Sequence, residues 1–297
     1  MSDALRRSPV SGSRPPATPA LLGFAAAFVL TQAADQALVL VVAHSRSGGQ
    51  QGRLADEAAS FVQSTAGMSA VPVLNGMLLV ALAAALATLQ TVRSGGTPAG
   101  RLRLRPQVGS GLRGAIATTA GLLGLSVACG AGIDLLGVSP GSTMDVMQSA
   151  FRSPSPAQLA LAAAAIGVVP GVAEEVFFRG FLLESLSASW GLWPGIIASA
   201  AAFGLIHVDP VQVGAAFVAG VFLAWSARRL GSIRPTIVAH AVNNVAFLVL
   251  AASGLEGGPS PTRNVGALCA GALLCAASAW WMPSGAGRSA EVNGVSP

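Results

Sequence analysis

One short stretch of the chain, residues 173–180, places three ionisable side chains inside an otherwise apolar run. These are Glu174, Glu175 and Arg179. A charge at the centre of a membrane helix costs about 2.5 to 3.5 kcal/mol, so three charges without partners would cost roughly 8 to 10 kcal/mol. Ionisable residues at such a depth are functional candidates by default, and His207 and His240 occur in apolar segments further along.

On a helix, Glu175 and Arg179 lie at i and i+4, the spacing at which a glutamate pairs with a basic residue one turn later. Glu174 projects about 100 degrees away and is left without a full partner. Because burial disfavours the charged form of a carboxylate, Glu174 is the predicted general base. The alternative is that all three side chains form one buried ion-pair network that holds the helices together.

Two further motifs, one around His207 and one around His240, carry groups that can assist such a base. His207 can share the proton work or position a water, although a single histidine in an apolar helix is also a common packing residue. Asp209, followed by Pro210, has the pattern of a helix cap and first turn.

His240 and Asn244 lie one turn apart and face the same way. Two hydrogen-bond donors on one face suit an oxyanion hole, where each donor contributes on the order of 2.7 to 4 kcal/mol. The alternative is hydrogen bonding between helices, a role that Asn243 fits better because it faces away.

Together these residues resemble a known family. The order Glu174-Glu175-x-x-x-Arg179, Phe203-x-x-x-His207 and His240-x-x-x-Asn244 is similar to the signature of the CAAX-protease and bacteriocin-processing family, the type II CAAX prenyl endopeptidases. The match covers about residues 159–253.

The resemblance implies an intramembrane endopeptidase that uses glutamate and needs no metal or other cofactor. In this family pattern, Glu174 and His207 activate the attacking water, and His240 and Asn244 stabilise the oxyanion. Glu175 and Arg179 support the base. A zinc-dependent metalloprotease is the alternative, but the chain has no His-Glu-x-x-His motif and Asn is a poor zinc ligand.

The composition places this chemistry in a lipid bilayer. Hydrophobic residues make up 53% of the 297 residues and charged residues only 10%, which predicts an all-α polytopic membrane protein. The family resemblance implies that its helices surround an intramembrane cavity. The basic residues do not cluster on a soluble module, so no nucleic-acid partner is expected. Cys129, Cys269 and Cys275 lack metal or disulfide spacing and are interpreted as packing residues.

Hydropathy predicts about eight spans in one transmembrane domain, residues 21–283, with disordered tails at 1–20 and 284–297. The family resemblance implies a protease core at about 159–253. The expected spans are 21–43, 73–92, 115–137, 159–183, 192–208, 211–228, 235–253 and 265–282.

Arginine distribution orients these spans. With Arg179 set aside, 12 arginines fall on one side and 4 on the other, so both termini are expected in the cytoplasm of a bacterial-type cell. The cluster at residues 101–105 is interpreted as a topogenic loop, with a headgroup-binding or nucleic-acid-binding patch as the alternative. This orientation puts His207 near the outer end of its span and His240 near the cytoplasmic start of another, although the site requires them to meet.

The predicted partners are the bilayer and a membrane-associated peptide or protein substrate. Two other functional classes compete with the peptidase. A proton-coupled transporter would show inverted repeats, and the two halves of the chain share no corresponding motifs. A non-catalytic immunity or scaffold protein would be expected to have lost a motif residue, and every motif position is present.

Overall fold

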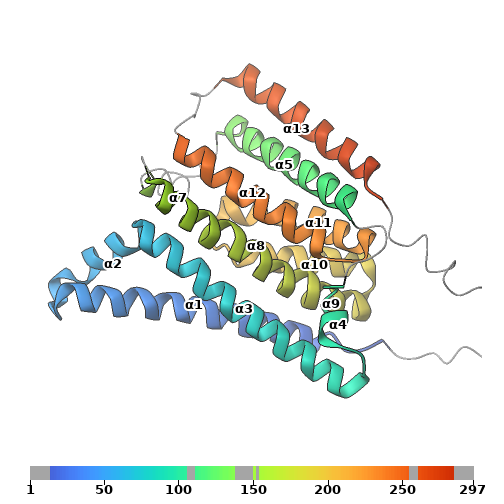
Figure 1. Cartoon of the computed structure of the whole chain (residues 1–297), viewed down its shortest axis with the longest axis horizontal. Helices are drawn as coiled ribbons and strands as arrows, with labels where there is room; N and C mark the ends of the chain where they lie inside the picture. Colours follow the sequence, from blue (N-terminus) through green and yellow to red (C-terminus); the bar gives the residue numbers. More distant parts are fainter. Residues whose placement is uncertain (1–13, 106–110, 138–149, 152–153, 254–259, 284–297) are drawn as a thin grey trace, which may run out of the picture.

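The computed structural model describes residues 14–105, 111–137, 150–151, 154–253 and 260–283, and their regular structure is entirely helical (Figure 1). The all-α polytopic class predicted from composition is confirmed. The expected tails at 1–20 and 284–297 lie largely outside the described residues, and residues 18–20 already belong to the first helix.

The elements follow one another along the chain as a series of helices. They are α1 (Thr18–Ser47), η1 (Gln51–Arg53), α2 (Leu54–Val62), α3 (Thr65–Ser94), α4 (Pro98–Arg101), α5 (Leu112–Leu135), α7 (Pro156–Ala162), η2 (Ala163–Val168), α8 (Val169–Glu174), η3 (Glu175–Leu182), α9 (Leu183–Trp190), α10 (Leu192–Leu205), α11 (Pro210–Leu230), α12 (Arg234–Ser253) and α13 (Pro261–Trp281).

Seven described helical segments are long and apolar enough to cross a membrane, one fewer than the eight spans expected. The exception is the predicted span 192–208, which is the 14-residue helix α10. At 1.5 Å per residue α10 is about 21 Å long, whereas the hydrocarbon core is about 30 Å thick. The end of α10 that carries His207 therefore does not need to lie at the outer surface.

The segment 156–190 is one continuous helix that is longer than the predicted span 159–183. It contains two π-helical stretches, η2 and η3. Pro170 follows η2, and a proline ring clashes with the carbonyl four residues earlier, here that of Ile166, which accounts for the wider turn. π-helical turns are frequent at functional sites, and η3 begins at Glu175.

The helices stack from α13 and α5 at one edge, through α12 and the 156–190 segment, to α3 and α1 at the other (Figure 1). α10 and α11 pack against each other behind α12 and η3 in this view. The segment 156–190 therefore occupies the centre of the bundle, with α12 on one side and α3 on the other.

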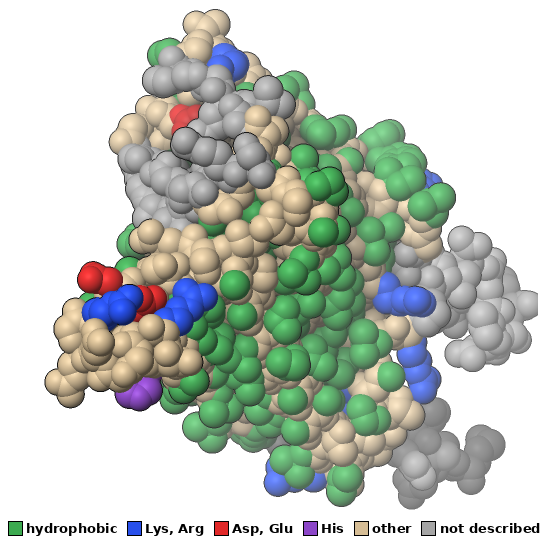
Figure 2. Space-filling view, turned by 60° about the vertical axis from the view of Figure 1, so that its left-hand side comes forward, with side chains coloured by type: hydrophobic (Ala, Val, Ile, Leu, Met, Phe, Trp, Pro, Cys, Tyr) green, Lys and Arg blue, Asp and Glu red, His purple; other side chains and the backbone are tan. Residues whose placement is uncertain are grey.

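The face of the bundle seen in Figure 2 is largely apolar. Figure 2 shows a broad face of hydrophobic side chains, with charged side chains gathered beyond its two ends. Large apolar residues such as Val41, Met77 and Leu273 are more than half exposed on this surface, which is expected where the solvent is lipid. The chain is an integral membrane protein.

The arginines of the loop that follows α3 also have structural contacts. Arg103 and Arg228 both pair with Glu184, at 2.9 and 2.7 Å, which ties this loop to α9 and α11. Leu102 is buried in the main core, where a side chain at Gly180 would meet its carbonyl oxygen. The loop closes one end of the bundle as well as carrying charge that can orient it.

Candidate active site

The predicted ion pair between Glu175 and Arg179 is present and fully buried. Arg179 Nη1 lies 2.8 Å from Glu175 Oε1, and the two side chains are 1% and 0% exposed. The same oxygen of Glu175 lies 3.0 Å from Nδ1 of His240, which comes from α12. Glu175 is therefore held from two directions, by its own helix and by α12.

Glu174 is held much less firmly than its neighbour. Its side chain is 16% exposed, and its Oε2 lies 3.7 Å from Nε2 of His240, beyond hydrogen-bond distance. Glu174 is thus outside the tight Glu175–Arg179–His240 cluster. Its carboxylate is accessible in a way that the carboxylate of Glu175 is not.

His207 joins this site through Phe203. Nδ1 of His207 lies 2.9 Å from the carbonyl oxygen of Phe203, and because a carbonyl only accepts hydrogen bonds, Nδ1 must donate. In the neutral ring, Nε2 is then an acceptor with a free lone pair. A short helix α10 that ends close to His207 places this nitrogen within the bundle.

Phe203 is the aromatic ring against which both histidines pack. Its centroid lies 5.1 Å from the ring of His207 and 5.7 Å from the ring of His240, in edge-to-face geometry. The guanidinium carbon of Arg179 lies 4.1 Å from the same centroid. The two histidines that hydropathy placed at different depths therefore meet around one side chain.

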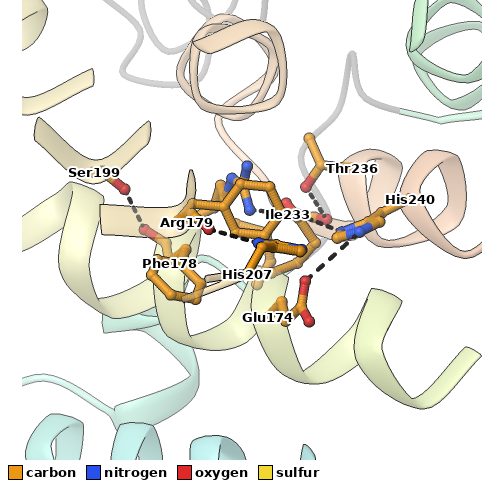
Figure 3. Close-up of polar contacts among 10 residues, drawn as sticks. Glu174, Phe178, Arg179, Ser199, His207, Ile233, Thr236 and His240 are labelled. Atoms are coloured by element: carbon orange, nitrogen blue, oxygen red, sulfur yellow. Dashed lines mark hydrogen bonds and ion pairs between the residues drawn. The ribbon is translucent and has the colours of Figure 1, made fainter. Parts of the chain in front are cut away.

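Figure 3 shows the carboxylate of Glu174 pointing toward the imidazole ring of His240. Ser199 of α10 donates to the carbonyl of Phe178 at 2.9 Å, which ties α10 to η3 behind the site (Figure 3). Thr236 donates to the carbonyl of Ile233 at 2.8 Å at the start of α12 (Figure 3). These bonds fix the elements that carry the histidines.

Asn244 lies one turn beyond His240 on α12 and is half-buried. Within the described part of the chain its carboxamide has no hydrogen-bond partner. Asn243 instead accepts a hydrogen bond from Ser126 of α5 at 2.7 Å, so the predicted role of Asn243 between helices is confirmed. Asp209 accepts hydrogen bonds from the backbone of Val211 and Gln212, which confirms it as the cap of α11.

The close approach of α8 and α12 depends on Gly171. A side-chain carbon at this position would lie 2.8 Å from the backbone nitrogen and Cα of Ala241, the residue after His240. Because the obstacle is backbone, a larger residue would push the helices apart. Gly171 was not singled out from the sequence, since a glycine in a membrane helix carries no local sign of its contact.

The donor set of the described residues contains no group of three or more His, Cys, Asp and Glu side chains placed to hold a metal ion. Glu175, whose oxygen is shared by Arg179 and His240, is already occupied. The described residues therefore present no complete set of zinc ligands.

A family model described as type II CAAX prenyl endopeptidase Rce1-like matches residues 156–246. The similarity to this family is confined to that part of the chain. The matched Rce1-like segment runs from the start of α7 into α12 and contains all of the candidate residues above. Searches of curated proteins and of solved structures found no match. The Rce1-like match points to a CAAX-type intramembrane protease.

Proposed function

We propose that the chain is an intramembrane endopeptidase that hydrolyses a peptide bond of a membrane-associated peptide or protein. The observation that carries this proposal is the unequal environment of the two adjacent glutamates. Glu175 is locked by Arg179 and His240, whereas Glu174 is accessible and lies beside the imidazole of His240. An accessible carboxylate next to a fixed one is the arrangement expected of a base and its support.

Glu174 and His207 activate the attacking water in this mechanism. The carboxylate of Glu174 and Nε2 of His207 are both acceptors, so together they orient a water and take its proton. The water oxygen bonds to the carbonyl carbon of the peptide, and the proton passes to the leaving amine nitrogen as the C–N bond breaks. The apolar surroundings raise the strength of each of these hydrogen bonds, because they act in a low-dielectric site.

His240 serves the oxyanion as an imidazolium ion. Its Nδ1 donates to the buried carboxylate of Glu175, so Nε2 can donate to a substrate oxygen only when both ring nitrogens carry a proton. When His240 is protonated, the positive charges of His240 and Arg179 balance the negative charges of Glu174 and Glu175. A neutral cluster is the least costly one in a membrane interior. Asn244 supplies the second donor.

An apolar groove runs along α12. The groove has a volume of about 600 Å³ and is lined by α12 and Val168, and its members Ala241 and Val245 adjoin His240 and Asn244 in sequence. Its lining is almost entirely apolar, so it does not satisfy the hydrogen bonds of a peptide backbone. We assign it to a hydrocarbon chain of the substrate.

Cleavage of membrane-anchored peptides by purified protein in detergent tests the proposal. We expect Glu174→Gln to reduce kcat by at least 100-fold, because the amide cannot take a proton from water. Glu57→Gln, which changes a carboxylate on α2, is the matched control and should cleave like wild type. Comparison of lipidated and unlipidated forms of one peptide tests the groove.

Three results would overturn the mechanism. Loss of turnover on treatment with a chelator, with recovery on addition of zinc, would favour the metalloprotease. Glu174-dependent proton flux into vesicles without any cleavage would favour a transporter. A variant Glu174→Gln that is as active as wild type would remove Glu174 from the chemistry.

A further inference from the structure

A second polar contact lies inside the bundle, one helix away from the candidate active site. Asp35 lies in the middle part of α1, and Asn75 of α3 donates to its Oδ2 at 3.1 Å through Nδ2. Asp35 is also conspicuous in the sequence, because it is the one acidic residue in the predicted span 21–43. An intramembrane carboxylate requires a functional or structural explanation.

The remaining oxygens of this pair have no partner. Asp35 Oδ1 and Asn75 Oδ1 are both buried, and neither takes part in a hydrogen bond within the described residues. Both are acceptors if Asp35 is ionised, so neither can satisfy the other. Protonation of the Asp35 carboxyl group supplies the missing donor.

No positive side chain of the described residues forms an ion pair with Asp35. On α1 the nearest basic side chains in sequence are His44 and Arg46, more than two turns away. The charged side chains on α3 and on elements that pack against α1 or α3 are Asp56 and Glu57 on α2, Arg93 on α3, Arg101 on α4, Glu174 on α8, and Glu175 and Arg179 on η3. Arg53 lies on η1, which packs against α2. None of them is in an ion pair or hydrogen bond with Asp35, and Arg179 and Arg53 are paired with Glu175 and Glu57.

We propose that Asp35 and Asn75 form an intramembrane proton-binding site, a carboxylic acid–carboxamide pair that clasps α1 to α3. Asp35 holds a proton taken from water on Oδ1 and donates it in a hydrogen bond to Asn75 Oδ1. Asn75 Nδ2 donates to Asp35 Oδ2 in return. The pair is then uncharged and fully hydrogen-bonded, which is what a lipid-embedded contact requires.

The position of the pair links it to the helix that carries Glu174. Gly76, the residue after Asn75, packs so closely on α8 that a side-chain carbon there would meet Val169 and Ala173. α3 is thus held between α1 and α8. Loss of the proton creates a negative charge with no partner, so it loosens α1 from α3 when the pH is raised far enough.

Infrared spectroscopy of the protein in lipid vesicles tests the protonation state directly and does not depend on peptidase activity. We expect the wild-type protein at neutral pH to show a carboxylic acid C=O band that is absent from Asp35→Asn. Asn75→Leu should retain the band but shift its frequency to that of a weakly hydrogen-bonded carboxylic acid. Glu184→Gln, which removes an ion-paired carboxylate, should leave the band unchanged. A wild-type spectrum without this acid band overturns the proposal.

Stability measurements supply the second test. Asp35→Asn should unfold at nearly the wild-type temperature, because two carboxamides form the same pair of hydrogen bonds, whereas Asp35→Leu should unfold at a lower temperature. Raising the pH should lower the wild-type unfolding temperature and leave that of Asp35→Asn unchanged. A wild-type unfolding temperature that rises with sodium chloride but not with choline chloride, and only when Asp35 is present, would identify a sodium site instead of a proton site.

Discussion

Two adjacent glutamates have different partners, although they differ by one position on the same helix. Glu175 is at the start of η3, where Arg179 and His240 both reach its Oε1. Glu174 is the last residue of α8 and keeps an accessible carboxylate. The alternative of one ion-pair network therefore describes Glu175 and Arg179 well but leaves Glu174 available for a reaction.

The two asparagines of α12 give a residue-scale test of the oxyanion hole. We expect Asn244→Ala to lower kcat by about 100-fold to 1,000-fold with little change in unfolding temperature, since its carboxamide lacks a partner in the described structure. Asn243→Ala, which removes the contact with Ser126, should cost about 0.6 kcal/mol and retain activity. Equal activity losses in both variants would contradict the assignment.

Phe203 is a positioning residue in this interpretation, because it contacts both histidines and Arg179 and has no group that reacts. Phe203→Leu removes these ring contacts, and we expect about 1 to 3 kcal/mol of lost stability together with a lower kcat at nearly unchanged KM. Phe222→Leu is the matched control, because Phe222 is buried in a separate cluster beside Trp225. Activity of Phe203→Leu equal to that of Phe222→Leu would show that the ring contacts do not position the site.

At the scale of the elements, the site depends on how closely α8 and α12 approach. The sequence separation between Glu175 and His240 is 65 residues, so their contact exists only because these helices pack against each other. The π-helical turns on either side of α8 and the short α10 are further departures from regular spans. Irregular backbone of this kind is tolerated in a membrane where protein surrounds it.

Gly171 provides the element-scale prediction. We expect Gly171→Ala to separate α8 from α12 and to reduce cleavage at least tenfold, because the new methyl group would lie 2.8 Å from the backbone of Ala241. Gly130→Ala on α5 is the matched control, since nothing lies within 4 Å of a side-chain carbon there. The measurements are kcat/KM and the unfolding temperature in detergent. Wild-type activity in Gly171→Ala would mean that the two helices can shift without disturbing the site.

At the scale of the whole molecule, the short α10 does not change the predicted orientation. α10 and α11 pack against each other and are joined by the four residues 206–209, so the chain returns to the side on which α10 begins. Apart from α11, the described structure has six long segments, and six crossings return the chain to the side on which it began. Both termini are therefore still expected on the arginine-rich side.

Reporter fusions test this orientation in cells. A fluorescent protein fused to the C-terminus should be fluorescent, and alkaline phosphatase fused there should be inactive, since both reporters would remain in the cytoplasm. Fusions made after Gly49, at the end of α1, should show the reverse pattern. The same pattern at both positions would overturn the predicted topology.

The sequence by itself determined the features that depend on spacing along one helix. The pairing of Glu175 with Arg179, the shared face of His240 and Asn244, and the cap at Asp209 follow from local periodicity, and the apolar composition predicts the fold class. Tertiary structure alone decided which nitrogen of His240 meets Glu175, how both histidines reach Phe203, and that Asp35 meets Asn75. These contacts join residues on different helices, and the depth and rotation of each helix are set by packing against its neighbours, which no local pattern encodes.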